Sequence, residues 1–150
     1  MRLALLWVHV LAAVVWIGGL AWQAHVLAPA ARRGEMRAFA VAAQRGRPFT
    51  WTAIGLVVLT GFYNVTQLGP LERAMESGVG LLVAAKFLLV ILAVAVASQR
   101  DFAQVPRLAR AVAGEEDPSA AFRAIGWLDR IVLLLGLAIL YLGLAISRTV

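Results

Sequence analysis

The chain has no cysteine, which excludes disulfide bonds, thiolate metal ligands and cysteine nucleophiles. It is also poor in charge, because only 15% of its 150 residues are charged, whereas a soluble domain carries about 25%. Hydrophobic residues make up 62% of the sequence. These values predict an integral membrane protein whose first partner is the lipid bilayer, and the length is that of one compact domain, residues 1–150.

Several chemical motifs are missing as well. The sequence has no glycine-rich phosphate loop, no zinc-protease motif and no nucleophile with an adjacent base. Its two histidines, His9 and His25, share one apolar segment, so it lacks the histidine pairs of a two-haem four-helix cytochrome. Met1, Met36 and Met75 lie outside the apolar segments, which leaves a copper(I) channel without soft ligands. Whether the chain is an enzyme stays open.

Apolar stretches of about 20 residues predict membrane-spanning helices. We predict such helices at residues 3–27, 49–68, 79–98 and 127–146. The expected fold is all-α, a four-helix transmembrane bundle with antiparallel, up-down topology. The first stretch is longer than the apolar core of a signal peptide, so we expect a span and not a cleaved leader. Pro48 suits the first turn of the second helix, and Gly69-Pro70 suits its end.

The basic residues predict how these helices are oriented. Nine arginines lie in the first and third connections, residues 28–47 and 99–126, whereas three lie on the other side of the bundle. The positive-inside rule therefore places these two connections in the cytoplasm and both termini outside. This rule explains the net charge of +6, and we expect no nucleic acid partner. The alanine- and arginine-rich composition is that of a GC-rich bacterial genome, and we expect a multi-pass protein of the bacterial cytoplasmic (inner) membrane.

Other features predict local packing. In the third connection, apolar residues recur at helical spacing and predict a short amphipathic helix on the membrane surface. These residues are Phe102, Val105, Leu108, Ala109 and Val112. In the last span, Gly136 and Gly143 align with Asp129 and Ser147 on a face suited to tight packing, and Asp129 is expected to face Arg123, Arg130 or headgroups. The five tryptophans, Trp51 among them, are expected mostly in the interfacial belts.

Lys86 is the only lysine and lies inside the third predicted span. A charged side chain there costs ~3 kcal/mol or more unless it is paired, hydrated or able to reach the interface. At the helical rise per residue, both Lys86 and His9 lie about 10 Å below the outer surface. Near the same level the other spans carry polar residues, namely Tyr141 and a stripe of Thr60, Asn64 and Gln67. The sequence therefore predicts a polar layer in the outer half of the bundle.

Further residues share the helix face of His9. Trp16, Gly19 and Gln23 follow it at helical spacing. Gly18-Gly19 removes side-chain bulk, so a neighbouring helix or a flat ligand is expected to approach closely there. His25 lies on a different side of the helix, near the cytoplasmic surface, and cannot share a ligand with His9.

Two interpretations of the polar residues stay open. His9 is either a neutral histidine hydrogen-bonded to a neighbouring helix, or a ligand of a metal ion or haem. Lys86 either extends to the headgroups, or binds a haem propionate or a substrate carboxylate, or ligates iron after deprotonation. One haem b with His9 as axial ligand suits the donor inventory better than copper, which stays the second candidate cofactor. Lys86, Trp16, Gly19, Asn64 and Tyr141 would complete the binding site.

Three segments resemble a known membrane domain. The run from His9 to Leu20, followed by Leu27-Ala-Pro29 and Arg32-Arg33, resembles the opening helix of the CopD-type copper-resistance membrane domain. Leu59-Thr60-Gly61-Phe62-Tyr63 resembles the "LTG" helix of that family, and Lys86 with Gln99-Arg100 resembles its third helix. The resemblance covers about the first two-thirds of the chain. It implies electron transfer or copper and haem handling at the cell surface, with a redox or copper-handling partner.

The sequence is also similar to the HemJ-type protoporphyrinogen oxidases, through His9, Trp16, Gly19 and Lys86. In that family the histidine and the lysine are associated with haem b and with activity. The chain departs from the pattern at His25, where the family has an arginine, and around Ala97-Ser98, where it has a histidine. These departures weaken the expectation of oxidase activity more than that of haem binding.

Three functions therefore compete. The first is a CopD-like protein that binds one haem b or a metal ion through His9 in the outer half of the bundle. The second is a HemJ-like oxidase that passes electrons to quinone. The third is a cofactor-free structural or assembly subunit, alone or as a homo-oligomer. Tight binding of haem through His9 would exclude the third.

Overall fold

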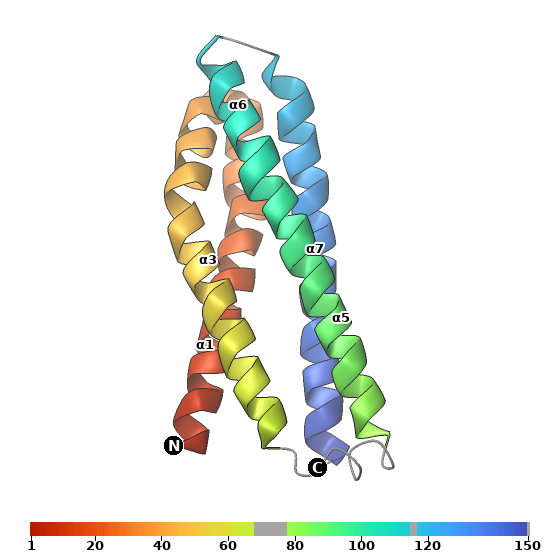
Figure 1. Ribbon diagram of the computed structural model, residues 1–150. Coiled ribbons are helices and arrows are strands. Elements are labelled where there is room, and N and C mark those ends of the chain that lie inside the picture. Colours follow the sequence, from red (N-terminus) through yellow and green to blue (C-terminus); the bar gives the residue numbers. More distant parts are fainter. Residues whose placement is uncertain (68–77, 115–116, 150) are drawn as a thin grey trace.

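The computed structural model describes residues 1–67, 78–114 and 117–149, and these residues form helices without any strand (Figure 1). The all-α prediction is therefore confirmed. In chain order the elements are α1 (Arg2–Trp22), η1 (Gln23–Leu27), α2 (Ala28–Ala30), η2 (Ala31–Glu35), α3 (Met36–Thr66), α5 (Val79–Ser98), η3 (Gln99–Gln104), α6 (Val105–Val112) and α7 (Pro118–Thr149), where η marks a short π-helical segment. The predicted stop at Gly69-Pro70 lies outside the described residues.

A glycine turns the first helical stretch back on itself. Gly34 has a φ of +117°, a left-handed value that favours glycine, and after it α3 returns alongside α1 (Figure 1). Residues 28–47, predicted as a connection, are themselves helical. Over the described ranges, three helical stretches are long and apolar enough to cross a membrane: Arg2–Thr66, Val79–Val112 and Pro118–Arg148. The predicted four-helix transmembrane bundle is thus not confirmed.

Two helices, α3 and α7, are longer than the predicted spans, whereas α5 has the predicted bounds. α3 has 31 residues, about 46 Å at 1.5 Å per residue, whereas the hydrocarbon core of a bilayer is about 30 Å thick. Pro48 consequently lies inside α3 and not in its first turn. α7 begins at Pro118, where the carboxylate of Asp117 accepts a 3.0 Å hydrogen bond from the backbone N–H of Ser119. This bond holds the pKa of the exposed Asp117 below its usual value.

The third predicted connection is largely helical and packs against other helices. η3 and α6 continue the rod that α5 begins, and α6 packs against both α3 and α7 (Figure 1). Val105 and Leu108 are fully buried in these contacts, whereas Phe102 is exposed. The helical periodicity was therefore interpreted correctly, but the apolar face packs against protein instead of lipid.

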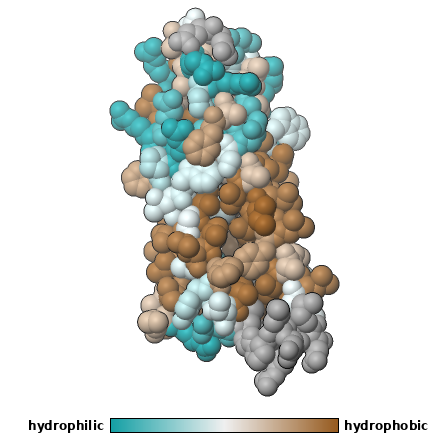
Figure 2. Space-filling view, viewed as in Figure 1, coloured by the Kyte–Doolittle hydropathy of each residue, from teal (hydrophilic) through white to brown (hydrophobic). Residues whose placement is uncertain are grey.

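The apolar core has two parts. One surrounds the Gly34 turn and α6, and its largest members are Phe39, Leu108, Phe122 and Ile125. The other lies in the middle of the helices and includes Trp16, Leu20, Ile54 and Val132. Figure 2 shows a hydrophobic surface over the half that holds the N-terminus and a hydrophilic surface at the α6 end. Exposed arginines at the hydrophilic end include Arg32, Arg33, Arg37, Arg45, Arg107, Arg110 and Arg123.

One face of α7 receives side chains from two other helices. A Cβ atom on Gly136 would overlap Ile17 Cδ1 of α1. A Cβ atom on Gly143 would lie 3.3 Å from Lys86 Nζ of α5. The tight packing predicted for this glycine face is therefore present at both positions.

Candidate functional site

His9 is anchored to α3 by Thr60. Its Nδ1 lies 2.9 Å from Thr60 Oγ1, and the Thr60 hydroxyl in turn donates to the carbonyl oxygen of Leu56. Because a hydroxyl has a single hydrogen, Thr60 Oγ1 accepts from His9, and this network assigns the ring proton to Nδ1. Nε2 of the neutral imidazole then keeps its lone pair, as in histidines that ligate metals through Nε2.

The neighbouring glycine makes room for the imidazole ring. A Cβ atom on Gly61 would lie 3.2 Å from His9 Cε1 and 3.7 Å from Nδ1. Thr60 and Gly61 therefore both position the His9 ring. Thr60 accepts its hydrogen bond, and Gly61 leaves space for the ring on the surface of α3. This contact gives a structural role to two residues of the Leu59-Thr60-Gly61 motif, Thr60 and Gly61.

Replacing Thr60 by valine tests this assignment, because valine keeps the shape and removes the acceptor. We expect the His9 ring of Thr60→Val to lose its preference for the Nδ1–H tautomer. The chain has two histidines, so ¹⁵N-histidine NMR follows His9 with His25 as internal reference. Gly61→Ala should disturb the same signals through crowding. Unchanged His9 signals in both variants would contradict the anchoring.

Lys86 packs against a different helix from His9. Its half-buried ammonium packs over Gly143 of α7, whereas His9 contacts α3. Within the described residues, Lys86 has no hydrogen bond or ion pair. The structure thus places His9 against α3 and Lys86 against α7, with no bond between them.

Of the other predicted site residues, some are buried or half-buried between helices and one is exposed. Asn64 is half-buried on α3, and Gln67 at the end of α3 accepts a 2.8 Å hydrogen bond from Arg2 Nε. Trp16 is buried in the middle core. In contrast, Tyr141 is 72% exposed on the outside of α7 and does not face the interior.

The glycine pair of α1 has a different environment from the one expected. Gly18 and Gly19 are exposed, and a Cβ atom on either would meet nothing within 4 Å. The predicted close approach of a helix is therefore wrong for the described residues. His25 is exposed and bonds to the backbone oxygen of Ala21 at 2.9 Å, far along the chain from His9.

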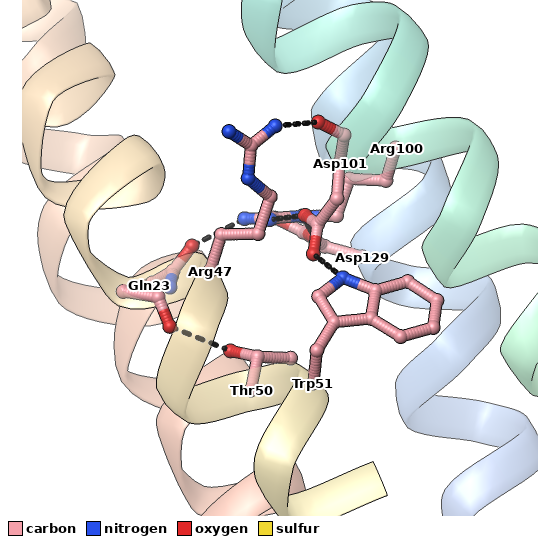
Figure 3. A network of polar contacts seen from close by, with 8 residues as sticks. Gln23, Arg47, Thr50, Trp51, Arg100, Asp101 and Asp129 are labelled. Atoms are coloured by element: carbon pink, nitrogen blue, oxygen red, sulfur yellow. Dashed lines mark hydrogen bonds and ion pairs between the residues drawn. The ribbon is translucent and has the colours of Figure 1, made fainter. Parts of the chain in front are cut away.

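A second polar layer lies towards the arginine-rich end, and the sequence analysis missed it. Figure 3 shows Arg100 at its centre, among Gln23 of η1, Asp101 of η3 and Asp129 of α7. The guanidinium donates to Asp129 Oδ1 through Nε, to Asp101 Oδ1 through Nη1 and to Gln23 Oε1 through Nη2. Arg100 is 4% exposed, so this is a buried three-way contact.

α3 completes the second layer from the other side. Trp51 Nε1 donates to Asp101 Oδ2 at 3.0 Å, and Arg47 Nη1 donates to the Asp101 backbone oxygen at 3.3 Å (Figure 3). Arg47 and Trp51 both pack on the ring of Phe102. Trp51 is therefore a hydrogen-bond donor to a buried carboxylate and not simply a belt residue.

These contacts correct two predictions. Asp129 pairs with Arg100 and not with Arg123, Arg130 or headgroups. Arg100 itself had been assigned to the loop charges that set topology. One signal in the sequence was available: Asp129 is the only acidic residue in any predicted span, and an acid at that depth requires a partner.

A small cavity of about 10 Å³ adjoins the second layer. Polar groups of Gln23, Thr50, Arg100 and Asp101 line it, together with Trp16, Leu20, Ala97 and Val132. This volume is close to that of one water molecule as measured with a water-sized probe. Across the described residues, no group of three or more His, Cys, Asp or Glu side chains is arranged to hold a metal ion.

Comparison with known proteins identifies the family. The family model of copper resistance protein D matches residues 40–146. Neither a curated protein nor a solved structure gives a match. The matched range begins after His9, but it includes Thr60, Lys86, Arg100 and Asp129 and covers well over half of the chain. The chain therefore belongs to the copper resistance protein D (CopD) family.

Proposed function

We propose that this membrane protein of the copper resistance type binds one haem b in the outer half of its bundle, with His9 Nε2 as an axial ligand. The observation that carries the proposal is the hydrogen bond between His9 Nδ1 and Thr60. An imidazole whose Nδ1–H has a fixed acceptor presents Nε2 in one orientation, which is how metal-ligating histidines are commonly held.

The donor groups fit haem better than a bare copper ion. Haem b brings its own four nitrogen ligands, so one or two axial groups from the protein are sufficient. Copper(I) prefers several soft ligands, and the described residues contain no group of three candidate side chains. Met1 is 94% exposed, and Met36 packs with the core at the arginine-rich end.

Lys86 and Asn64 have supporting roles in this proposal. The Lys86 ammonium would bind a carboxylate such as a haem propionate, because it has no ion-pair partner among the described residues and lies in the layer of His9. The half-buried Asn64 follows Thr60 by one helical turn. When bound, haem b supplies one-electron transfer, which suits a redox or copper-handling partner. Tyr141 is too exposed to belong to this set.

The proposal includes a topology. We infer that the stretch Arg2–Thr66 crosses the membrane twice, since Gly34 reverses it, so that the chain makes four spans. The arginine-rich α6 end would lie in the cytoplasm and both termini outside. In this arrangement, in a bacterial inner membrane, His9 and Lys86 lie near the outer surface.

A reduced-minus-oxidised visible spectrum of the protein in mild detergent tests haem binding. We expect a Soret band with sharp reduced α and β bands, which His9→Ala loses. His25→Ala is the matched control, because His25 is exposed and far from the outer layer. Lys86→Met should retain the α and β bands if Lys86 is a charge partner, and alter them if it ligates iron.

Two results would contradict the haem proposal. The first is a colourless protein that stays colourless after haem is added. The second is a spectrum that His9→Ala leaves unchanged. Either result would favour the cofactor-free structural subunit, and porphyrin production by the purified protein would instead favour the oxidase.

A further inference from the structure

The two carboxyl groups around Arg100 are not equivalent. Both oxygens of Asp101 have donors, Arg100 Nη1 on Oδ1 and Trp51 Nε1 on Oδ2. Asp129 accepts from Arg100 at Oδ1 only. Its Oδ2 is buried and has no hydrogen-bond partner in the described part of the chain, and the residue is 1% exposed.

The charges around Asp129 do not balance if both carboxyl groups are ionised. One guanidinium, that of Arg100, contacts two carboxyl groups. Gln23 from η1 is neutral. Arg47 from α3 is directed to the Asp101 backbone and the ring of Phe102, and Arg130 of α7 stacks on Trp127. A buried carboxylate oxygen without a donor is strongly disfavoured, and such groups become neutral by taking up a proton.

The small cavity beside Arg100 has room for about one water molecule. It lies against Arg100, and its polar lining includes Gln23 and Thr50, which are both half-buried. A water molecule in this position would have enough polar partners to be held. Asp129 does not line the cavity, so such a water would contact Arg100 and not the Asp129 carboxyl group.

We propose that Asp129 is a proton-binding site of this membrane domain, with the proton on Oδ2 in exchange with water. Binding forms one O–H bond with a proton from water, and release breaks it. The neutral carboxyl group still accepts from Arg100 at Oδ1, so Arg100 and Asp101 remain an ion pair. The site is independent of His9 and of any cofactor in the outer layer.

Carboxyl ¹³C NMR of aspartate-labelled protein tests the proposal directly. The chain contains three aspartates, Asp101, Asp117 and Asp129, so three carboxyl signals are expected. At neutral pH the Asp101 and Asp117 signals should be those of ionised groups, and the Asp129 signal that of a protonated one. Asp117→Asn and Asp101→Asn assign two signals, and Asp129→Asn should remove the third.

The unmodified protein already decides the main test, because three ionised aspartate signals at neutral pH would overturn the proposal. An ionised Asp129 signal at neutral pH in the unmodified protein would overturn the proposal. Exchange is read from the infrared band of the protonated carboxyl group, which should shift in D₂O and be absent in Asp129→Asn. A band that never shifts would overturn the exchange of the Asp129 proton with water.

Discussion

Arg100→Leu is expected to prevent the protein from reaching a stable fold, or to lower the free energy of unfolding by about 3–5 kcal/mol. The substitution leaves Asp101 and Asp129 buried without the cation that they share, and it removes the donor to Gln23. The effect should appear as a large loss of folded protein in detergent, or as a large fall in the midpoint of thermal unfolding.

Two further variants give this prediction its controls. Arg107→Leu removes the same charge from an exposed site on α6, and we expect a change below about 0.5 kcal/mol. Replacing the whole cluster, by Arg100→Leu with Asp101→Asn and Asp129→Asn, should recover much of the loss, because no unpaired charge is then buried. Equal losses for Arg100→Leu and Arg107→Leu would refute the structural role of Arg100.

Gly136→Ala is expected to destabilise the bundle by about 1–3 kcal/mol, because the new methyl group overlaps Ile17 Cδ1 and the core must be overpacked. The substitution therefore acts on the contact between α1 and α7. Thermal unfolding in detergent measures it. The partner change Ile17→Val removes the overlapping atom, so the double variant should be more stable than Gly136→Ala alone.

The same glycine-to-alanine change at Gly18 should not lower the stability of the bundle. Gly18 meets open space, and an alanine in a helix interior is favoured over glycine by about 0.5–1 kcal/mol. Gly18→Ala should therefore be neutral or stabilising. A destabilisation of the same size at Gly18 and Gly136 would show that backbone flexibility, and not the contact with Ile17, determines the effect.

The sequence predicted how deep a residue lies along its helix better than the direction in which its side chain points. Hydropathy and a constant rise per residue place His9, Thr60 and Lys86 at one depth, and the structure joins His9 to Thr60 by a hydrogen bond. Tyr141 was assigned to the same depth, but it faces outwards. Each residue turns the helix by about 100°, so a small error in helix rotation moves a side chain from the interior to the lipid.

The second layer was missed for a different reason. Arg100 lies just past the end of a predicted span, where an arginine is ordinarily a topology signal. Its role depends on η3 continuing α5 without a break and on α7 starting well before residue 127. Hydropathy marks where an apolar run ends and not where a helix ends, so neither feature could be derived from composition.

The inner face of α7 also limits how the domain can move. Asp129, Gly136 and Gly143 are spaced seven residues apart and nearly in line, and they meet Arg100, Ile17 and Lys86 respectively. If α7 slid along its axis by one turn in either direction, Val132 or Leu140 would replace Gly136 against Ile17, and the ion pair would break at the same time. A piston-like stroke of this helix is therefore blocked, and any rearrangement that includes α7 has to be a tilt of packed helices about contacts that keep their register.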